Sequence, residues 1–220
     1  MYIVGQSGKM IKALFKYDYK NQIGTVIDTT SGRGDYNKLS PFILEVIDPM
    51  TQHLVLFENL WQFSKVYKSQ LDKNGNPSES WYYWRRGGVM DDKAHRYPMG
   101  KGAIPEYSYL NGEKLGYIEA RKKIYAPIYA HHVKPTASFE SLKSLYDTGR
   151  DITLLDYDAY DHAQLGMSLI DVINNPKRKM GHAFVLIMML EGILDECLKT
   201  DSSQPFNIHV RCLQGAGIVC

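Results

Sequence analysis

The sequence predicts an α+β fold in a single domain, with a small N-terminal β-rich part packed on a helical bundle. Short apolar runs separated by Gly, Asn, Asp and Pro turns fill the first quarter of the chain. From Glu58 onward the apolar residues recur at helical spacing. A chain of 220 residues is long enough for one well-buried core. We therefore expect residues 1–57 to be β-rich, 58–199 to be mainly helical and 200–220 to form a tail.

The first elements follow from local patterns. Apolar runs at residues 11–17, 23–27, 42–47 and 53–57 predict strands. Leu60, Phe63 and Tyr67 then share one helical face, which predicts a short helix over 58–67. The polar composition of residues 69–80 predicts a mobile loop, and the Gly, Pro and Tyr content of residues 94–112 predicts an ordered loop over the surface.

The second half of the sequence predicts mainly helices. One is expected over residues 115–130 with a kink or break at Pro127, and another over 138–147 with Gly149 at its C-cap. A strand should begin at Asp151, followed by a short helix over 164–173. A long helix is expected from Pro176 to Lys199, because proline is favoured in a first helical turn. Residues 206–220 could add an edge strand.

The charge of the chain excludes a protein that binds nucleic acid through its overall field. Twenty-six Lys and Arg against 24 acids leave a net charge of +2, so any contact with nucleic acid must be local. Aromatic residues reach 12%, including 16 Tyr, and could stack on bases or cap the core. No GxSxG, HExxH, P-loop or GxGxxG pattern occurs, which leaves serine hydrolase, zincin and dinucleotide-fold predictions without support.

Cysteine usage and hydropathy indicate the compartment. The sequence has three cysteines, an odd number, and no CxxC motif: Cys197, Cys212 and Cys220. This usage favours a reducing, cytoplasmic setting. The apolar run at residues 183–190 is far shorter than the roughly 20 residues that cross a bilayer, and we expect no membrane association. We expect no metal and no cofactor.

Three carboxylates gather after the strand that begins at Asp151. Asp156, Asp158 and Asp161 could hold a hard cation, although the Gly and distal Glu of a calcium loop are missing. Crowded carboxylates also raise one another's pKa, which suits general acid–base chemistry. The remaining alternative is a set of solvated acids in a turn.

Glu58 opens the first predicted helix directly after a strand. The helix dipole alone would favour a carboxylate there. Trp61 and Lys65 follow it on the same face at one-turn spacings, so the same residue could instead project into a cleft that also offers a ring and a cation.

Two basic segments are candidate anion sites. The first turn of the predicted long helix would hold Lys177, Arg178 and Lys179. A bound anion there would relieve the repulsion between these cations and the positive end of the helix dipole. Alternatively, the three side chains could point into water. In residues 96–102, Arg96 and Lys101 bring charge next to two glycines. His182 could carry a proton or be a core histidine.

Short motifs resemble the NADAR or YbiA-like superfamily, whose members are N-glycosidases that act on nucleotide-derived substrates such as ribosyl-linked pyrimidines and ADP-ribosylated bases. Leu39-Ser-Pro-Phe42 is similar to the opening Ser-Asn-Phe region of that family. Phe57-Glu58-Asn-Leu-Trp-Gln-Phe-Ser-Lys65 resembles its Val-Glu-His-x-x-Gln-x-x-Lys helix. Leu154-Leu-Asp-Tyr-Asp-Ala-Tyr-Asp161 resembles its Leu-Val-Glu-x-x-x-x-Asp segment, and Met180-Gly-His-Ala-Phe-Val-Leu186 its last helix. Residues 96–161 also resemble an uncharacterised phage and bacterial group.

The resemblance implies a YbiA-like fold and a hydrolase of N-glycosyl bonds. Its substrate would be a nucleotide or ADP-ribosyl compound, either free or carried on nucleic acid. The alternative is a non-catalytic protein, of phage type, that binds a nucleotide or a host protein. The catalytic candidates are Glu58, Asp158 and Asp161. The candidates for holding phosphate, base and sugar are Trp61, Lys65, Trp84, Arg96, Lys101, Asp156, Lys179 and His182.

Overall fold

The first sheet joins two N-terminal strands to a strand from late in the chain. The computed structural model describes residues 10–20, 22, 24–32 and 34–199. In it, β8 (Ile152–Asp156) lies between β1 (Ile11–Phe15) and β2 (Thr25–Asp28), and both pairings are parallel. All five residues of β8 are buried, as expected for the central strand of a parallel sheet. The expected N-terminal β-rich part is therefore completed by a strand that follows more than 120 residues later.

Two small antiparallel sheets lie in the other half of the molecule. The first pairs β3 (Glu45–Ile47) with β4 (Leu54–Leu56), and α1 (Phe57–Phe63) begins directly after β4. The second contains β5 (Lys65–Val66), β6 (Tyr107–Leu110) and β7 (Glu113–Leu115) in that order. The predicted junction of strand and helix before Glu58 is confirmed.

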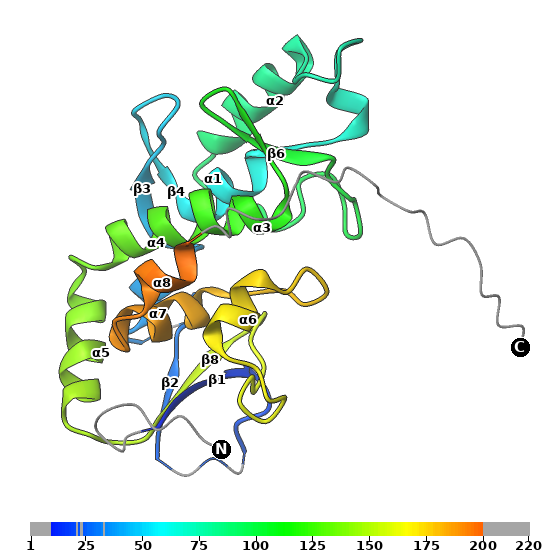
Figure 1. Cartoon of the computed structure of the whole chain (residues 1–220). Helices are drawn as coiled ribbons and strands as arrows, with labels where there is room; N and C mark the ends of the chain where they lie inside the picture. Colours follow the sequence, from blue (N-terminus) through cyan, green and yellow to red (C-terminus); the bar gives the residue numbers. More distant parts are fainter. Residues whose placement is uncertain (1–9, 21, 23, 33, 200–220) are drawn as a thin grey trace, which may run out of the picture.

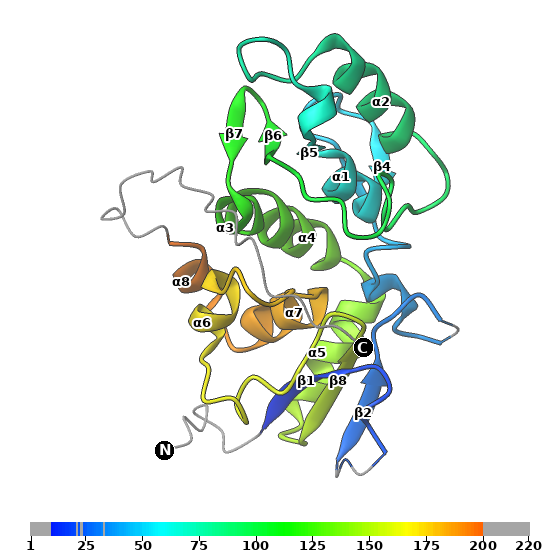
Figure 2. The ribbon, with the colours of Figure 1, turned by 90° about the vertical axis from the view of Figure 1, so that its right-hand side faces the viewer.

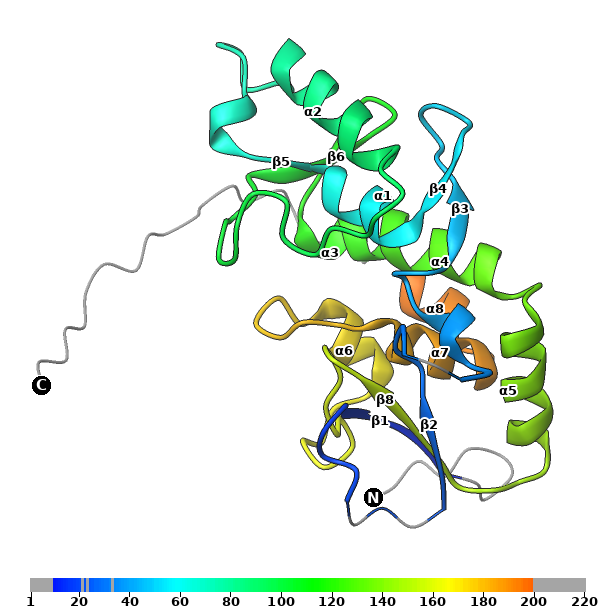
Figure 3. The same cartoon turned by 180° about the vertical axis from the view of Figure 1, so that it is seen from behind.

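A helical row separates the two halves (Figures 1 and 2). It consists of α3 (Tyr117–Ala120), a π turn (Arg121–Tyr125) and α4 (Ala126–Val133). On one side lie α1, α2 (Glu79–Val89) and the two antiparallel sheets. On the other lie the parallel sheet, α6 (Leu169–Asn174), α7 (His182–Leu190) and α8 (Leu194–Leu198), while α5 (Ala137–Asp147) runs along one flank (Figure 3).

One apolar core runs through the described residues. Helix α7 is buried from His182 to Met188 and packs against β1, β8 and α4. Buried residues of α1, the helical row and β8 belong to the same cluster. The described chain is thus a single mixed α/β domain with small sheets, and its core surrounds the ends of the parallel strands.

Several predicted boundaries are wrong for identifiable physical reasons. The expected long helix over 176–199 is instead a turn followed by α7 and α8, with Gly181 as the N-cap of α7. Lys177, Arg178 and Lys179 therefore precede the helix and do not occupy its first turn. The helix expected over residues 115–130 is instead α3, the π turn and α4 in succession, and Pro127 lies in the first turn of α4, where a missing N–H is tolerated. Residues 69–80 contain a 3-10 turn (Lys68–Gln70) and the start of α2.

Candidate functional site

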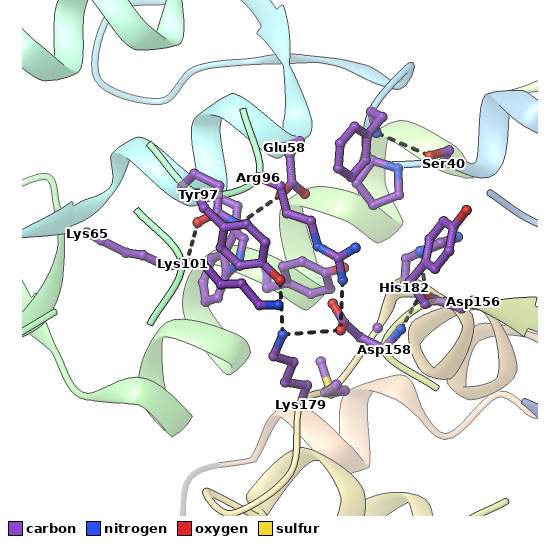
Figure 4. Close-up of a pocket in the computed structure, with 18 of the residues that line it drawn as sticks. Ser40, Glu58, Lys65, Arg96, Tyr97, Lys101, Asp156, Asp158, Lys179 and His182 are labelled. Carbon is purple, nitrogen blue, oxygen red and sulfur yellow. Dashed lines mark hydrogen bonds and ion pairs between the residues drawn. The ribbon is translucent and has the colours of Figure 1, made fainter. Parts of the chain in front are cut away.

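A cavity of about 600 Å³ opens where the parallel strands end. Its walls come from the start of α7, from α1, from the π turn and from the loop over residues 96–103 (Figure 4). Ligands commonly bind beyond the carboxyl ends of parallel strands, and this volume falls within the roughly 300–1,000 Å³ typical of small-molecule sites. The cavity is large enough for a nucleotide.

Most of the predicted site residues line this one cavity. They come from segments separated by as much as 124 residues, and the parallel pairing of β8 brings them together. The predicted residues that line it are Glu58, Trp61, Lys65, Arg96, Lys101, Asp156, Asp158, Lys179 and His182.

An acid and an amide on helix α1 and an amine at the start of β5 form a hydrogen-bonded chain. Gln62 donates from Nε2 to Glu58 Oε1 at 2.8 Å, and Lys65 Nζ donates to Gln62 Oε1 at 2.6 Å. Lys65 Nζ also lies 5.0 Å from the centre of the Trp61 ring. Only 6% of Glu58 is exposed. Trp61 and Gln62 lie three and four positions after Glu58, so one face of α1 holds these three residues, and Lys65 follows two residues after the end of the helix.

Burial moves the pKa values of both ends of this chain toward neutrality. It raises the pKa of Glu58 from 4.5 to about 7, against the opposing influence of Gln62, Lys65 and Arg96. It lowers the pKa of Lys65 from 10.5 to about 8, although the carboxyl of Glu58 acts in the opposite direction. An acid and an amine that both titrate near neutral pH suit proton transfer.

Positive charge gathers around Asp158 in the same cavity. Arg96 NH2 donates to Asp158 Oδ1 at 2.9 Å, and Lys179 Nζ lies 3.6 Å from the same oxygen, so the two cations approach it from different sides (Figure 4). Lys179 also reaches the hydroxyl of Tyr97 at 3.3 Å. Lys101 makes no hydrogen bond or ion pair with any described residue. Three cations against one carboxylate leave this part of the cavity able to hold an anion.

Asp156 and His182 form a buried ion pair in the wall of the cavity. Asp156 Oδ2 lies 3.0 Å from His182 Nδ1, and His182 Nε2 lies 2.9 Å from the carbonyl oxygen of Thr29. The second oxygen of Asp156 accepts from the N–H of Asp158 at 3.0 Å. The pair therefore connects β8, β2 and α7, and it fixes the backbone that carries Asp158.

The pKa shifts of this pair favour the charged form of both groups. Burial alone would raise the pKa of Asp156, but the charge and hydrogen bond of His182 outweigh it and hold that pKa at about 2. Burial lowers the pKa of His182, yet Asp156 and the Thr29 carbonyl raise it above its usual range. A Cβ on Gly181 would lie 2.0 Å from Asp156 Oδ2, so only glycine leaves room for the carboxylate. Asp156 and His182 thus organise the site from within the protein.

Two predicted site residues do not line the cavity. Asp161 borders a smaller hollow of about 240 Å³ and lies 3.5 Å from Lys12 Nζ. Trp84 packs on Phe63, with ring centres 4.5 Å apart, and also contacts Tyr67. Asp161, a predicted catalytic residue, therefore lies apart from Glu58 and Asp158, because the chain after β8 brings Asp158 to the cavity and Asp161 to Lys12 of β1.

Two residues that build the site, Gln62 and Asn59, were not among the predicted site residues. Gln62 connects Glu58 to Lys65, and its spacing on the helix was the available signal. Asn59 is fully buried and binds the carbonyls of Asp91 and Lys93 and the N–H of His95, which fixes the loop that leads to Arg96. No sequence pattern could have revealed these contacts, since they join segments more than 30 residues apart.

No metal or membrane feature accompanies the site. The described residues contain no group of three or more His, Cys, Asp or Glu side chains that could hold a metal ion. None of their helices is long and apolar enough to span a bilayer. Comparison of the chain with protein-family models, curated proteins and solved structures finds no match.

Proposed function

We propose that this protein is an N-glycosidase-like hydrolase that acts on a nucleotide-derived or ADP-ribosyl substrate, and that it is a diverged member of the NADAR or YbiA-like group. The observation that carries the proposal is the combination of groups that line one cavity. Glu58 and Lys65, whose pKa values lie near neutrality, share it with the three cations Arg96, Lys101 and Lys179. A phosphorylated sugar joined to a base matches both sets of groups.

Glu58 supplies the acid and base steps of this mechanism. Protonated Glu58 gives its proton to the nitrogen of the leaving base as the bond from that nitrogen to the sugar C1 breaks. The resulting carboxylate, beside Lys65, then takes a proton from water as the hydroxide adds to C1. The products are the free base and the sugar with a hydroxyl at C1, and Glu58 returns to its starting form.

The remaining residues bind the substrate. Arg96, Lys101 and Lys179 hold its phosphates, because charged donors bind phosphate oxygens strongly. Trp61, which contacts the ring of Tyr125 at 5.1 Å, stacks against the base. Asp158 keeps Arg96 and Lys179 oriented. Asp161 takes no part, since it lies outside the cavity.

Lys65 offers a covalent variant of the same reaction. An amine whose pKa is about 8 is partly neutral near pH 7.5 and is then a nucleophile. The neutral Nζ would attack C1 and displace the base, which takes the proton of Glu58. Opening of the sugar ring would then give an imine between Nζ and C1. Sodium borohydride reduces such an imine to a stable amine. An adduct on Lys65 in the mass spectrum supports this variant, and its absence during turnover supports direct attack by water.

The test of the proposal is the release of free base from labelled nucleotides, NAD and ADP-ribosylated DNA, followed by chromatography. We expect release by the wild type and its loss in Glu58→Gln by orders of magnitude. Glu45→Gln makes the same chemical change at an exposed strand position and should behave as the wild type. If ADP-ribose binds equally well to the wild type and Glu58→Gln while neither releases base, the protein is a non-catalytic nucleotide-binding protein.

A further inference from the structure

A buried arginine in the π turn lies in the wall of the cavity. Arg121 is only 1% exposed and borders the cavity from the helical row. A π turn inside a helix is rare and often marks a functional position, because it shifts the side chains that follow. Arg121 forms no ion pair with any described residue, so its charge is balanced by other groups.

Those groups are backbone carbonyls at the end of α6 and in the turn that follows it. Arg121 NH1 donates to the carbonyl oxygens of Asn175 at 2.8 Å and of Val172 and Ile173 at 3.3 Å each. Its NH2 donates to the carbonyl of Arg178 and to the hydroxyl of Tyr117, the latter at 2.8 Å. The C-terminal end of a helix favours a cation, which explains how a charge without a carboxylate partner is tolerated in the interior.

These bonds fix the turn that presents Lys179. The carbonyl of Arg178 belongs to the residue directly before Lys179, and that of Asn175 lies at the start of the same turn. Within the turn, the N–H of Lys177 donates to Asn175 Oδ1, and this bond does not attach the turn to the rest of the fold. Arg121 therefore fixes the position of the backbone from which the side chain of Lys179 reaches Asp158 and Tyr97.

We propose that Arg121 is the positioning residue of the phosphate-binding part of the cavity and that it acts through Lys179 without touching the substrate. The inference rests on the proposed function, since it gives Lys179 a phosphate to bind. Lysine cannot reproduce these bonds, because an ammonium has three N–H donors on one nitrogen, whereas Arg121 donates to five oxygens from two nitrogens. The fork of the guanidinium is the feature that the site requires.

A double-mutant cycle tests the proposal with ADP-ribose as the ligand and isothermal titration as the measurement. We expect Arg121→Lys and Lys179→Met each to weaken binding about tenfold, and the double variant to bind no more weakly than Lys179→Met alone. Lys123→Met removes a cation from the exposed face of the same π turn and should leave the affinity unchanged. If Arg121→Lys weakens binding by the same factor with and without Lys179, Arg121 does not act through Lys179 and the proposal is overturned.

Hydrogen exchange separates this proposal from the proposed function. If the wild type binds no ADP-ribose and releases no base, the proposed function fails, but the anchoring can still be judged. Faster amide exchange over residues 175–181 in Arg121→Lys, with the rest of the chain unchanged, supports the anchoring. Unchanged exchange there overturns it. Should Arg121→Lys fail to fold, Tyr117→Phe removes one acceptor from Arg121, and the same cycle and exchange measurements apply to it.

Discussion

Replacing Glu58 with Gln should make the fold more stable at alkaline pH while it removes turnover. Burial raises the pKa of Glu58 to about 7, so the folded protein favours the protonated form more strongly than the unfolded chain does. For such a group the contribution to stability is complete below the unfolded pKa of 4.5 and is lost as the pH rises through about 7. A neutral amide at this position avoids that loss.

The size of the effect follows from the two pKa values. The interval from 4.5 to about 7, at about 1.4 kcal/mol for each pH unit, gives a cost of about 3 kcal/mol at pH 8. The attraction of Lys65 for the carboxylate is already contained in the pKa of Glu58, so the expected gain of the variant at pH 8 is the same, about 3 kcal/mol. For a chain of this length that corresponds to a rise in melting temperature of about 6–12 °C.

Thermal unfolding at pH 5 and pH 8, at one ionic strength, measures the effect. We expect Glu58→Gln to melt above the wild type at pH 8 and close to it at pH 5, where the buried carboxyl is protonated. Glu45→Gln should follow the wild type at both pH values, because Glu45 is exposed. A melting difference that does not change with pH, or a variant that melts lower at pH 8, would refute the reasoning that Glu58 is buried at a cost.

The remaining predictions concern the ion pair and the aspartates. His182→Ala should lower the free energy of unfolding by about 3–5 kcal/mol in urea at pH 6, because Asp156 is left buried without its cation. The carboxyl contributes above pH 3.8 and loses its contribution as the pH falls toward about 2, so an undiminished difference at pH 2 would count against the pair. Gly181→Ala should lower the melting temperature by several degrees, since its Cβ meets the carboxylate of Asp156; an unchanged temperature would contradict that contact. Asp161→Asn should keep the wild-type rate of base release, whereas Asp158→Asn should raise KM by loosening Arg96 and Lys179; equal effects on both would contradict the placement of Asp161 outside the cavity.

Local patterns in the sequence were sufficient for the elements that depend on neighbouring residues. The change from a two-residue to a helical period placed the junction of β4 and α1 at Glu58. The helix over 138–147 was also predicted closely, because Thr136 caps it with a hydrogen bond to the N–H of Phe139 and its apolar face is regular. In both cases the physical cause lies within a few residues of the element.

Other features were decided only by contacts between distant segments. Strand β8 joins β1 and β2, and this pairing carries Asp156 and Asp158 to the cavity while it leaves Asp161 beside Lys12. The end of α6 and the turn after it are held by Arg121, which explains why no helix begins at Pro176.

The sequence alone determined which chemical groups stand at the junction before α1, in the loop after β8 and in the two basic segments, since these follow from local order and period. Only the tertiary structure decided which of them meet and how strongly each binds its proton. Burial gives Glu58 and Lys65 their altered pKa values, and burial results from the packing of the whole domain around them.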